Sequence, residues 1–452
     1  MMGRHSRNFG YPPEVTEALP THHKAHRRPA LAALAHRDFR LLMTATVMQN
    51  LVLPMQFISL TFWAIDTYPG EKVAVSGLLV ATRGAGMLLF SFIGGALADR
   101  FERRRVLLAC ETAACAATAL IAFCMLTQPL GSATIVAILA LVFLAAAITS
   151  VDGPARSASI PVIVGTEDMT GAIGINNVAQ QITFPAVFPL VGFLNGVIGP
   201  GGALAWSLLA WAVSIPCLLA LRYGSRAAAR RTGGMLIEIR AGLAYARRDT
   251  IIFAVVGMVV VMQVVGMPGV GALGPVWMTQ VLGLSTTQFG FIGMLWGLGA
   301  VAASLFFARF GNVTRDGRTL ALMVLLFGIS AVIFGHSRVV VITAVANFGL
   351  GFAVSGAIVT ALTIVQHAAA EEFRGRVMGL FPLVMGLSML NVGPVSVTAQ
   401  LVGLELVVPL LAWTSLALGV AFAASSPTLR RGRPGPRQGK RAGVEAARAT
   451  AG

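Results

Sequence analysis

Long apolar segments run through almost the whole chain and limit its possible folds more than any other feature. A helix that crosses a membrane needs about 20 mainly apolar residues, and hydropathy predicts twelve such segments in the 452 residues. Their apolar runs are continuous rather than alternating, which excludes a β-barrel. We therefore expect an all-α integral membrane protein with twelve transmembrane helices. The expected spans are 41–65, 73–98, 106–127, 132–151, 169–194, 202–221, 250–277, 287–308, 320–336, 339–366, 377–404 and 406–425.

Composition agrees with a membrane protein and narrows the possible partners. Only 12% of the residues are charged, whereas soluble proteins have about 25%. The net charge of +16 would suit nucleic acid, but the basic residues lie in short connections and tails, and only 8% of residues are aromatic. Stacking surfaces for bases are therefore not expected. We expect a lipid bilayer as the environment, no nucleic-acid partner, and a monomer.

The sequence lacks the motifs of ATPases, metal sites and membrane enzymes. A P-loop ends in Lys followed by Ser or Thr, and none of the three lysines is followed by either residue. The four cysteines all lie in apolar segments, and none forms a CxxC pair. No cofactor, metal or catalytic site is therefore expected, and we do not expect an enzyme.

The distribution of Lys and Arg predicts the orientation in the membrane. Twelve spans place both termini on one side, and that side receives 31 of the 34 basic residues. The opposite side has only Lys72 and Arg338. Because cytoplasmic loops are rich in Lys and Arg, we expect both termini in the cytoplasm and the protein in the inner (plasma) membrane.

The spans divide into two equal groups, which suggests an internal duplication. A basic connection separates them, and within it residues 236–243 are expected to form a short surface helix. The expected parts are a cytoplasmic N-terminal tail (1–37), an N-terminal six-helix half (38–221), a cytoplasmic linker (222–249), a C-terminal six-helix half (250–425) and a basic cytoplasmic tail (426–452).

The connection between the second and third spans carries the most specific local motif. Residues 94–107 resemble the loop 2–3 motif of the major facilitator superfamily, G-x-x-x-D-[RK]-x-G-[RK]-[RK]. Glu102 stands where the family has Gly, which resembles the enterobactin-exporter and transmembrane-secretion-effector branch. The resemblance covers residues 38–425 and implies two six-helix halves around a cavity. The matching residues are Gly95, Asp99, Arg100, Arg103 and Arg104.

This charged motif predicts an inner gate. A basic connection is also a cytoplasmic retention signal by itself, which is the alternative explanation for its arginines. The resemblance implies that Asp99 meets the start of span eleven, where an acidic side chain suits a helix N-terminus. On the same side, Asp152 and Arg156 close span four, and Arg374 and Arg376 open span eleven. We expect these charges to hold the cytoplasmic entrance shut and to separate when it opens.

Two ionisable residues inside spans are candidates for energy coupling. Arg83 lies near mid-depth in span two, where an arginine costs roughly 2.5–3.5 kcal/mol on insertion scales. It should therefore face a cavity or a partner. Glu111 lies near the inner end of span three and is a candidate proton carrier. Structural pairing is the alternative for both residues.

Uncharged polar residues inside spans mark candidate walls of a substrate cavity. The resemblance implies that the spans carrying them surround the cavity, and hydrogen bonding between helices is the alternative. These residues are Gln49, Asn50, Gln56, Asn177, Gln181, Gln263, Asn347 and Asn391.

We interpret the chain as a secondary active transporter that works by alternating access around a midplane site. The branch resemblance implies export of a hydrophobic small molecule, such as a siderophore, drug or secondary metabolite, with protons as the coupling ion. The alternatives are an importer or uniporter of a small metabolite, and a permease subunit driven by a separate ATPase. The ATPase-driven permease would need long structured cytoplasmic loops, and only the 222–249 connection exceeds twenty residues.

Overall fold

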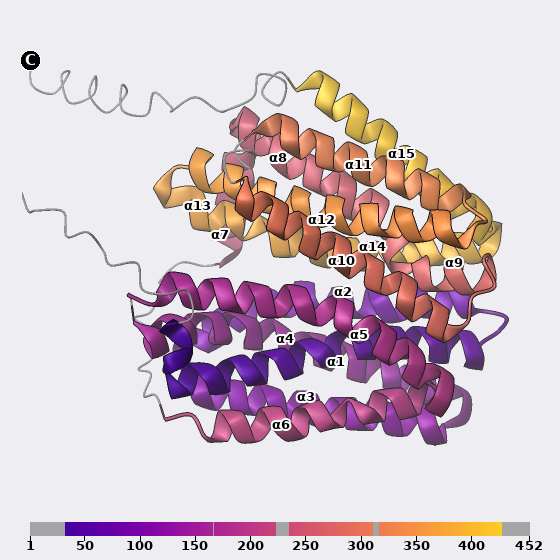
Figure 1. Ribbon diagram of the computed structural model, residues 1–452, viewed down its shortest axis with the longest axis horizontal. Helices are drawn as coiled ribbons and strands as arrows, with labels where there is room; N and C mark the ends of the chain where they lie inside the picture. The colour runs from indigo at the N-terminus through magenta and orange to yellow at the C-terminus, as the bar shows by residue number, and fades with distance from the viewer. Residues whose placement is uncertain (1–31, 166, 223–234, 311–315, 427–452) are drawn as a thin grey trace, which may run out of the picture.

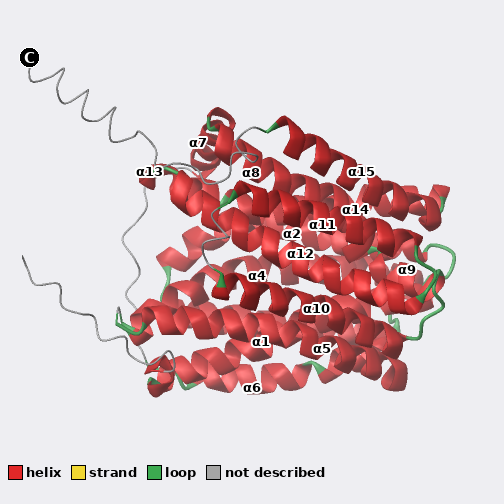
Figure 2. Cartoon of the chain, turned by 45° about the horizontal axis from the view of Figure 1, so that its top comes forward, coloured by secondary structure: helices red, strands yellow, loops and turns green. Residues whose placement is uncertain are grey.

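The computed structural model describes residues 32–165, 167–222, 235–310 and 316–426, and for 91–100, 170, 184 and 235–241 it describes the backbone alone. Within these ranges every regular element is a helix and no strand occurs (Figure 2). Eleven helical segments are long and apolar enough to cross a membrane. These findings confirm the predicted all-α membrane fold.

The N-terminal half is a bundle of α1 to α6 (Figure 1). A short 3-10 turn, η1 (Ala32–Ala35), precedes it, and a second, η2 (Gly131–Ala133), leads into α4. The helices are α1 (Arg37–Thr67), α2 (Lys72–Arg100), α3 (Arg103–Thr127), α4 (Thr134–Val164), α5 (Met169–Trp206) and α6 (Leu208–Leu219).

One of the eleven apolar segments makes two crossings rather than one. Gly171–Leu219 has 49 residues and would be about 74 Å long as a single helix, more than twice the hydrocarbon thickness of about 30 Å. Gly199 breaks it, with φ 72° and ψ 169°, a conformation that glycine adopts without a steric penalty. The chain then returns as the end of α5 and α6, which pack on α3 and α1. The eleven segments therefore contain twelve crossings.

The C-terminal half holds the remaining crossings, and several begin at polar caps. The Asp249 carboxylate accepts from the backbone N–H groups of Ile251 and Ile252, Ser285 and Gln288 form a capping box, and Asp316 caps α11. The elements are α8 (Thr250–Val260), η3 (Val261–Gly266), η4 (Pro268–Ala272), α9 (Gly274–Gln280), α10 (Thr286–Arg309), α11 (Gly317–His336), α12 (Val340–Ala368), α13 (Glu371–Met378), α14 (Leu380–Val402) and α15 (Leu404–Ser425).

The elements α8, η3, η4 and α9 form one crossing with an irregular middle. Both η3 and η4 are π-helical, a rare, wide winding that occurs frequently at functional sites. Pro268 starts η4 and cannot supply a backbone donor. This crossing therefore bends halfway through the bundle, where the two halves face each other.

The linker contains a helix, α7 (Met235–Arg248), that packs on the C-terminal half. The rings of Tyr245 and Phe373 stack with centroids 4.5 Å apart, and the Tyr245 hydroxyl accepts from the backbone N–H of Ala370. Helices α7 and α13 lie at one end of the bundle and α9 lies at the other (Figure 1). We call these the α7 end and the α9 end.

Candidate functional site

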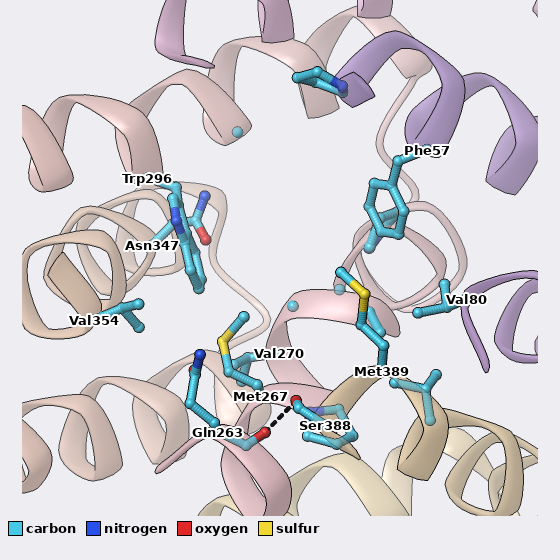
Figure 3. Close-up of a pocket in the computed structure, with 18 of the residues that line it drawn as sticks. Phe57, Val80, Gln263, Met267, Val270, Trp296, Asn347, Val354, Ser388 and Met389 are labelled. Atoms are coloured by element: carbon cyan, nitrogen blue, oxygen red, sulfur yellow. Dashed lines mark hydrogen bonds between the residues drawn. The ribbon is translucent and has the colours of Figure 1, made fainter. Parts of the chain in front are cut away.

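A cavity of about 390 Å³ lies between the two halves. Figure 3 shows Phe57 and Val80 of the N-terminal half facing Trp296, Asn347 and Val354 of the C-terminal half. Helix α5, the irregular crossing and α14 also contribute to the wall. The cavity size falls within the range of about 300–1,000 Å³ found for small-molecule sites.

Apolar side chains make up most of the cavity wall, and methionine is prominent among them. Thioether side chains are flexible and adapt to irregular ligands. The apolar side chains are Leu53, Pro54, Phe57, Val80, Phe188, Met267, Pro268, Val270, Ala272, Pro275, Met278, Phe289, Trp296, Val354, Met385, Met389 and Val392.

Four polar side chains interrupt this apolar wall: Arg83, Gln263, Asn347 and Ser388. Asn347 donates to the carbonyl of Ile292 at 2.7 Å, and the Ser388 hydroxyl donates to the carbonyl of Gln263 (Figure 3). The side-chain oxygen of Gln263 is buried without a partner. Among the described residues that line the cavity, Arg83 alone is charged.

Arg83 is 7% exposed and makes one described hydrogen bond, from Nη1 to Gln56 Oε1 at 3.0 Å. None of the ion pairs between described residues includes it. Arg83 and Gln56 also border a smaller void of about 20 Å³ between α1, α2 and α4. A buried guanidinium without a carboxylate therefore faces the space between the halves.

Helix contacts close the cavity toward the α9 end. Gln400 of α14 accepts from Val73 N at 3.2 Å and donates to Gly70 O at 2.9 Å, across the two halves. On the other side of the cavity, a Cβ on Gly192 of α5 would lie 2.6 Å from the carbonyl oxygen of Thr286. Phe62 and Phe289 meet edge to face with centroids 5.3 Å apart. Backbone contact and aromatic packing thus seal this end.

Toward the α7 end the same helices separate. Gln181 Nε2 donates to Ser304 Oγ at 2.7 Å. One turn earlier Asn177 is exposed, and a Cβ added to Gly174 would have no atom within 4 Å. Two cavity residues, Leu53 and Met385, are 42% and 46% exposed. The structure is therefore closed at the α9 end and open toward the α7 end.

A second polar cluster lies inside the N-terminal half, away from the cavity. Arg156 donates to Glu111 Oε1 at 2.6 Å and to both oxygens of Asp152 at 3.1 and 3.2 Å. Ser214 donates to Glu111 at 2.5 Å, and Gln49 donates to Asp152 at 2.8 Å. All three charged side chains are less than a tenth exposed. Two carboxylates therefore share one buried guanidinium.

This cluster places Asp152 and Arg156 differently from the sequence interpretation, which put both at the end of span four. Helix α4 continues to Val164, so both residues lie within it and point into the N-terminal half. The helix continues past two charges because each charge finds a buried partner. The structure therefore brings Asp152 and Arg156 together with Glu111 rather than with span eleven.

The other gate residues are separated in this structure or lie outside what it describes. Side chains at 95, 99 and 100 are not among the described ones, so Gly95, Asp99 and Arg100 are known only as the end of α2. Arg103 donates to Ala158 O at 2.7 Å, and Arg104 donates to Leu219 O at 2.6 Å, both within the N-terminal half. Arg374 is exposed on α13, and Arg376 lies 5.2 Å over the ring of Phe373.

The eight predicted cavity residues fall into three groups. Gln263 and Asn347 line the cavity, and Gln56 lines the adjoining void. Three connect helices: Gln49 to α4, Gln181 to α10, and Asn391 to the π-helical segment through Val264 O at 2.9 Å. The two others lie outside the cavity lining: the Asn50 amide nitrogen is buried without a partner, and Asn177 is exposed.

Sequence reasoning did not identify the methionines, Trp296 or Ser388 as cavity residues. In a crossing that is apolar on all sides, apolar residues that face a cavity, a neighbouring helix or lipid look alike. The one available signal was Pro268 with the glycines around it, which mark a deformed segment inside a span.

The sequence matches a known family over most of its length. The model of the Major Facilitator Superfamily matches residues 41–394. Macrolide efflux protein A of Streptococcus pyogenes is 25% identical over 341 residues, which covers 72% of this chain and 81% of that protein. Macrolide efflux protein A of Enterococcus faecalis is 24% identical over 329 residues, covering 70% and 98%. The finer resemblance to the enterobactin-exporter branch stays a prediction.

Solved transporter structures share the fold at low sequence identity. A nucleoside transporter superposes with a TM-score of 0.68 at 14% identity, covering 86% of this chain and 99% of the other. A bacterial homologue of the human lysosomal transporter Spinster gives 0.66 at 15%, covering 89% and 99%. A D-xylose–proton symporter gives 0.65 at 13%, covering 87% and 98%.

Proposed function

The chain belongs to the Major Facilitator Superfamily, and from this premise we propose that it exports a hydrophobic small molecule from the cytoplasm by alternating access. It is a multi-pass membrane transporter rather than an enzyme. The cavity of about 390 Å³ between the halves carries the proposal, because it is mainly apolar and contains one unbalanced charge. A site of this composition suits a ligand that leaves water readily.

The side to which the cavity opens is consistent with the proposed export. Helix α7 carries three Arg and one Glu and lies at the α7 end, and basic connections favour the cytoplasmic side. An exporter loads its substrate from a cavity that is open to the cytoplasm, and an importer passes through the same state when it releases its substrate. The relatives named as macrolide efflux proteins support the same direction and a plasma-membrane location.

We propose protons as the coupling ion and the Glu111–Arg156–Asp152 cluster as the carrier. Two carboxylates against one guanidinium leave an excess negative charge, and buried charge within a membrane is costly. Binding of one proton balances the cluster, and release leaves it unbalanced. Gln49 links the cluster to α1, which also lines the cavity, so a change in the cavity can reach the cluster.

We retain an inner gate at the α7 end as part of this proposal. Asp99 at the end of α2 faces the half that carries Arg374 and Arg376 when the two halves close there. In the open state the pairs are expected to be apart, and the exposed Arg374 agrees with that. Partly exposed pairs contribute roughly 0.2–1 kcal/mol each, which is enough for several of them to bias a two-state equilibrium.

Transport into inverted membrane vesicles tests this function. A panel of hydrophobic compounds should accumulate in vesicles that carry the wild-type protein and a pH gradient, and collapse of the gradient should abolish accumulation. Glu111→Gln should change the pH dependence of transport. Equilibration without a gradient would indicate a uniporter, gradient-driven depletion would indicate an importer, and an ATP requirement that survives an uncoupler would indicate an ATPase partner.

A further inference from the structure

We propose that the cavity binds an organic anion: an apolar molecule whose carboxylate, sulfonate or phosphate group is held by Arg83 and Gln56. The inference deepens the proposed function and rests on it, because it names the substrate class of the same cavity.

Arg83 and Gln56 together form a site of donors. A guanidinium has five N–H groups and no acceptor, and Arg83 uses one of them toward Gln56 Oε1. This bond fixes the orientation of the amide, because a flipped amide would bring two donors together. Gln56 Nε2 is therefore a second donor, and it is buried without a partner. The site has several free N–H groups and needs acceptor oxygens.

No described residue supplies the missing negative charge. The cavity lining contains no Asp or Glu, and the described ion pairs all lie elsewhere. The open acceptors among the described lining residues, such as Gln263 Oε1 of the opposite half, are neutral. Because an unbalanced buried cation is costly, the ligand is the remaining source of a counter-charge.

The shape of the site fits a ligand with one acidic group and an apolar body. The void of about 20 Å³ beside Arg83 and Gln56 has room for about one water-sized group, which suits an acid oxygen. The main cavity, which Arg83 also lines, is bordered by Phe57, Met389 and Trp296 and accepts the apolar part. A neutral apolar molecule would fill the cavity but would leave the N–H groups of Arg83 and Gln56 without acceptors.

Binding of a matched pair of probes to the purified full-length protein in detergent tests this proposal. The anion 8-anilino-1-naphthalenesulfonate and the neutral N-phenyl-1-naphthylamine share one apolar body and differ by the sulfonate. Calorimetric titration, corrected for protein-free micelles, should give an affinity for the anion at least about tenfold higher, because hydrogen bonds to charged groups are the strong ones. This assay needs no transport, so its failure and a failure of export are distinguishable.

Three variants identify the source of the preference. Arg83→Met should remove the preference for the anionic probe. Gln56→Glu should also remove this preference, because the new carboxylate pairs with the Arg83 guanidinium without changing the size of the side chain. Arg309→Met removes an equal charge from the exposed end of α10 and should keep the preference. Equal affinity for the two probes, a preference that survives both cavity variants, or no binding of either probe would overturn the anion site.

Discussion

Gly192 and Gly174 of α5 should shift the conformational equilibrium in opposite directions when each is replaced by alanine. They are eighteen residues apart, about five helical turns, so they lie on the same side of α5, at opposite ends of the contact with α10. In this structure a methyl on Gly192 would lie 2.6 Å from Thr286 O and 2.9 Å from the Cα of Gly290, whereas a methyl on Gly174 would meet nothing.

The size of the shift follows from these distances. Both atoms that oppose the Gly192 methyl belong to the backbone, so α5 and α10 must separate, at an overpacking cost of about 1–3 kcal/mol. If this cost applies only to the state that is closed at the α9 end, the equilibrium moves about 5- to 150-fold toward the state that is open at that end. Gly174→Ala costs nothing here and should disfavour the state in which the α7 end closes.

Spin-label distances across the α9 end measure this equilibrium. Ser132 and Val341 are exposed positions of the two halves, and labels there require replacement of the four free cysteines, Cys110, Cys115, Cys124 and Cys217. Gly192→Ala should populate a longer distance, and Gly174→Ala should reduce that population. An unchanged distribution in folded Gly192→Ala protein, or a shift in the same direction for both variants, would refute the reasoning.

Three further outcomes are expected. Arg156→Met should lower the free energy of unfolding by about 3–5 kcal/mol, because it leaves two buried carboxylates without their cation. Thermal unfolding in detergent measures this loss, and the double variant with Glu111→Gln should regain part of it. Asp99→Asn should increase labelling of cysteines placed in the half of the cavity near the α7 end and lower turnover, with little loss of substrate binding. Reporter fusions after Arg431 and within 223–234 should both show a cytoplasmic location.

Each of these outcomes has a contrary result. A wild-type melting temperature for Arg156→Met would show that the cluster contributes no stability. Unchanged labelling with normal turnover in Asp99→Asn would reduce the α2–α3 connection to a topology signal. Periplasmic activity from either fusion would contradict the twelve-span topology with both termini in the cytoplasm.

Hydropathy was sufficient to predict the crossings, because a membrane requires about 20 apolar residues per helix whatever the neighbours are. It also singled out Arg83, Gln263 and Asn347, since polar groups are rare where water is absent. Hydropathy could not orient the helices. Asn177 and Gln181 are one turn apart, yet only Gln181 reaches the opposite half.

The sequence interpretation was least successful where charges lie within helices. Asp152 and Arg156 looked like a connection because isolated charges end an apolar run. Their partners, Glu111 and Gln49, come from other helices, and no local pattern predicts a contact between distant segments. The break at Gly199 was predictable as a gap between two spans, but not as a single glycine within nearly continuous helix.

The methionine-rich wall also bears on how such a protein evolves. Met267, Met278, Met385 and Met389 come from different parts of the C-terminal half, and each thioether can change rotamer to fit a new shape. Surfaces of this kind repack around unlike partners, so the wall can accept ligands of a new shape before any of its residues mutates. At the proposed anion site, the N–H donors of Arg83 and Gln56 limit the charge of the ligand, since a change of ligand charge requires substitution of these residues.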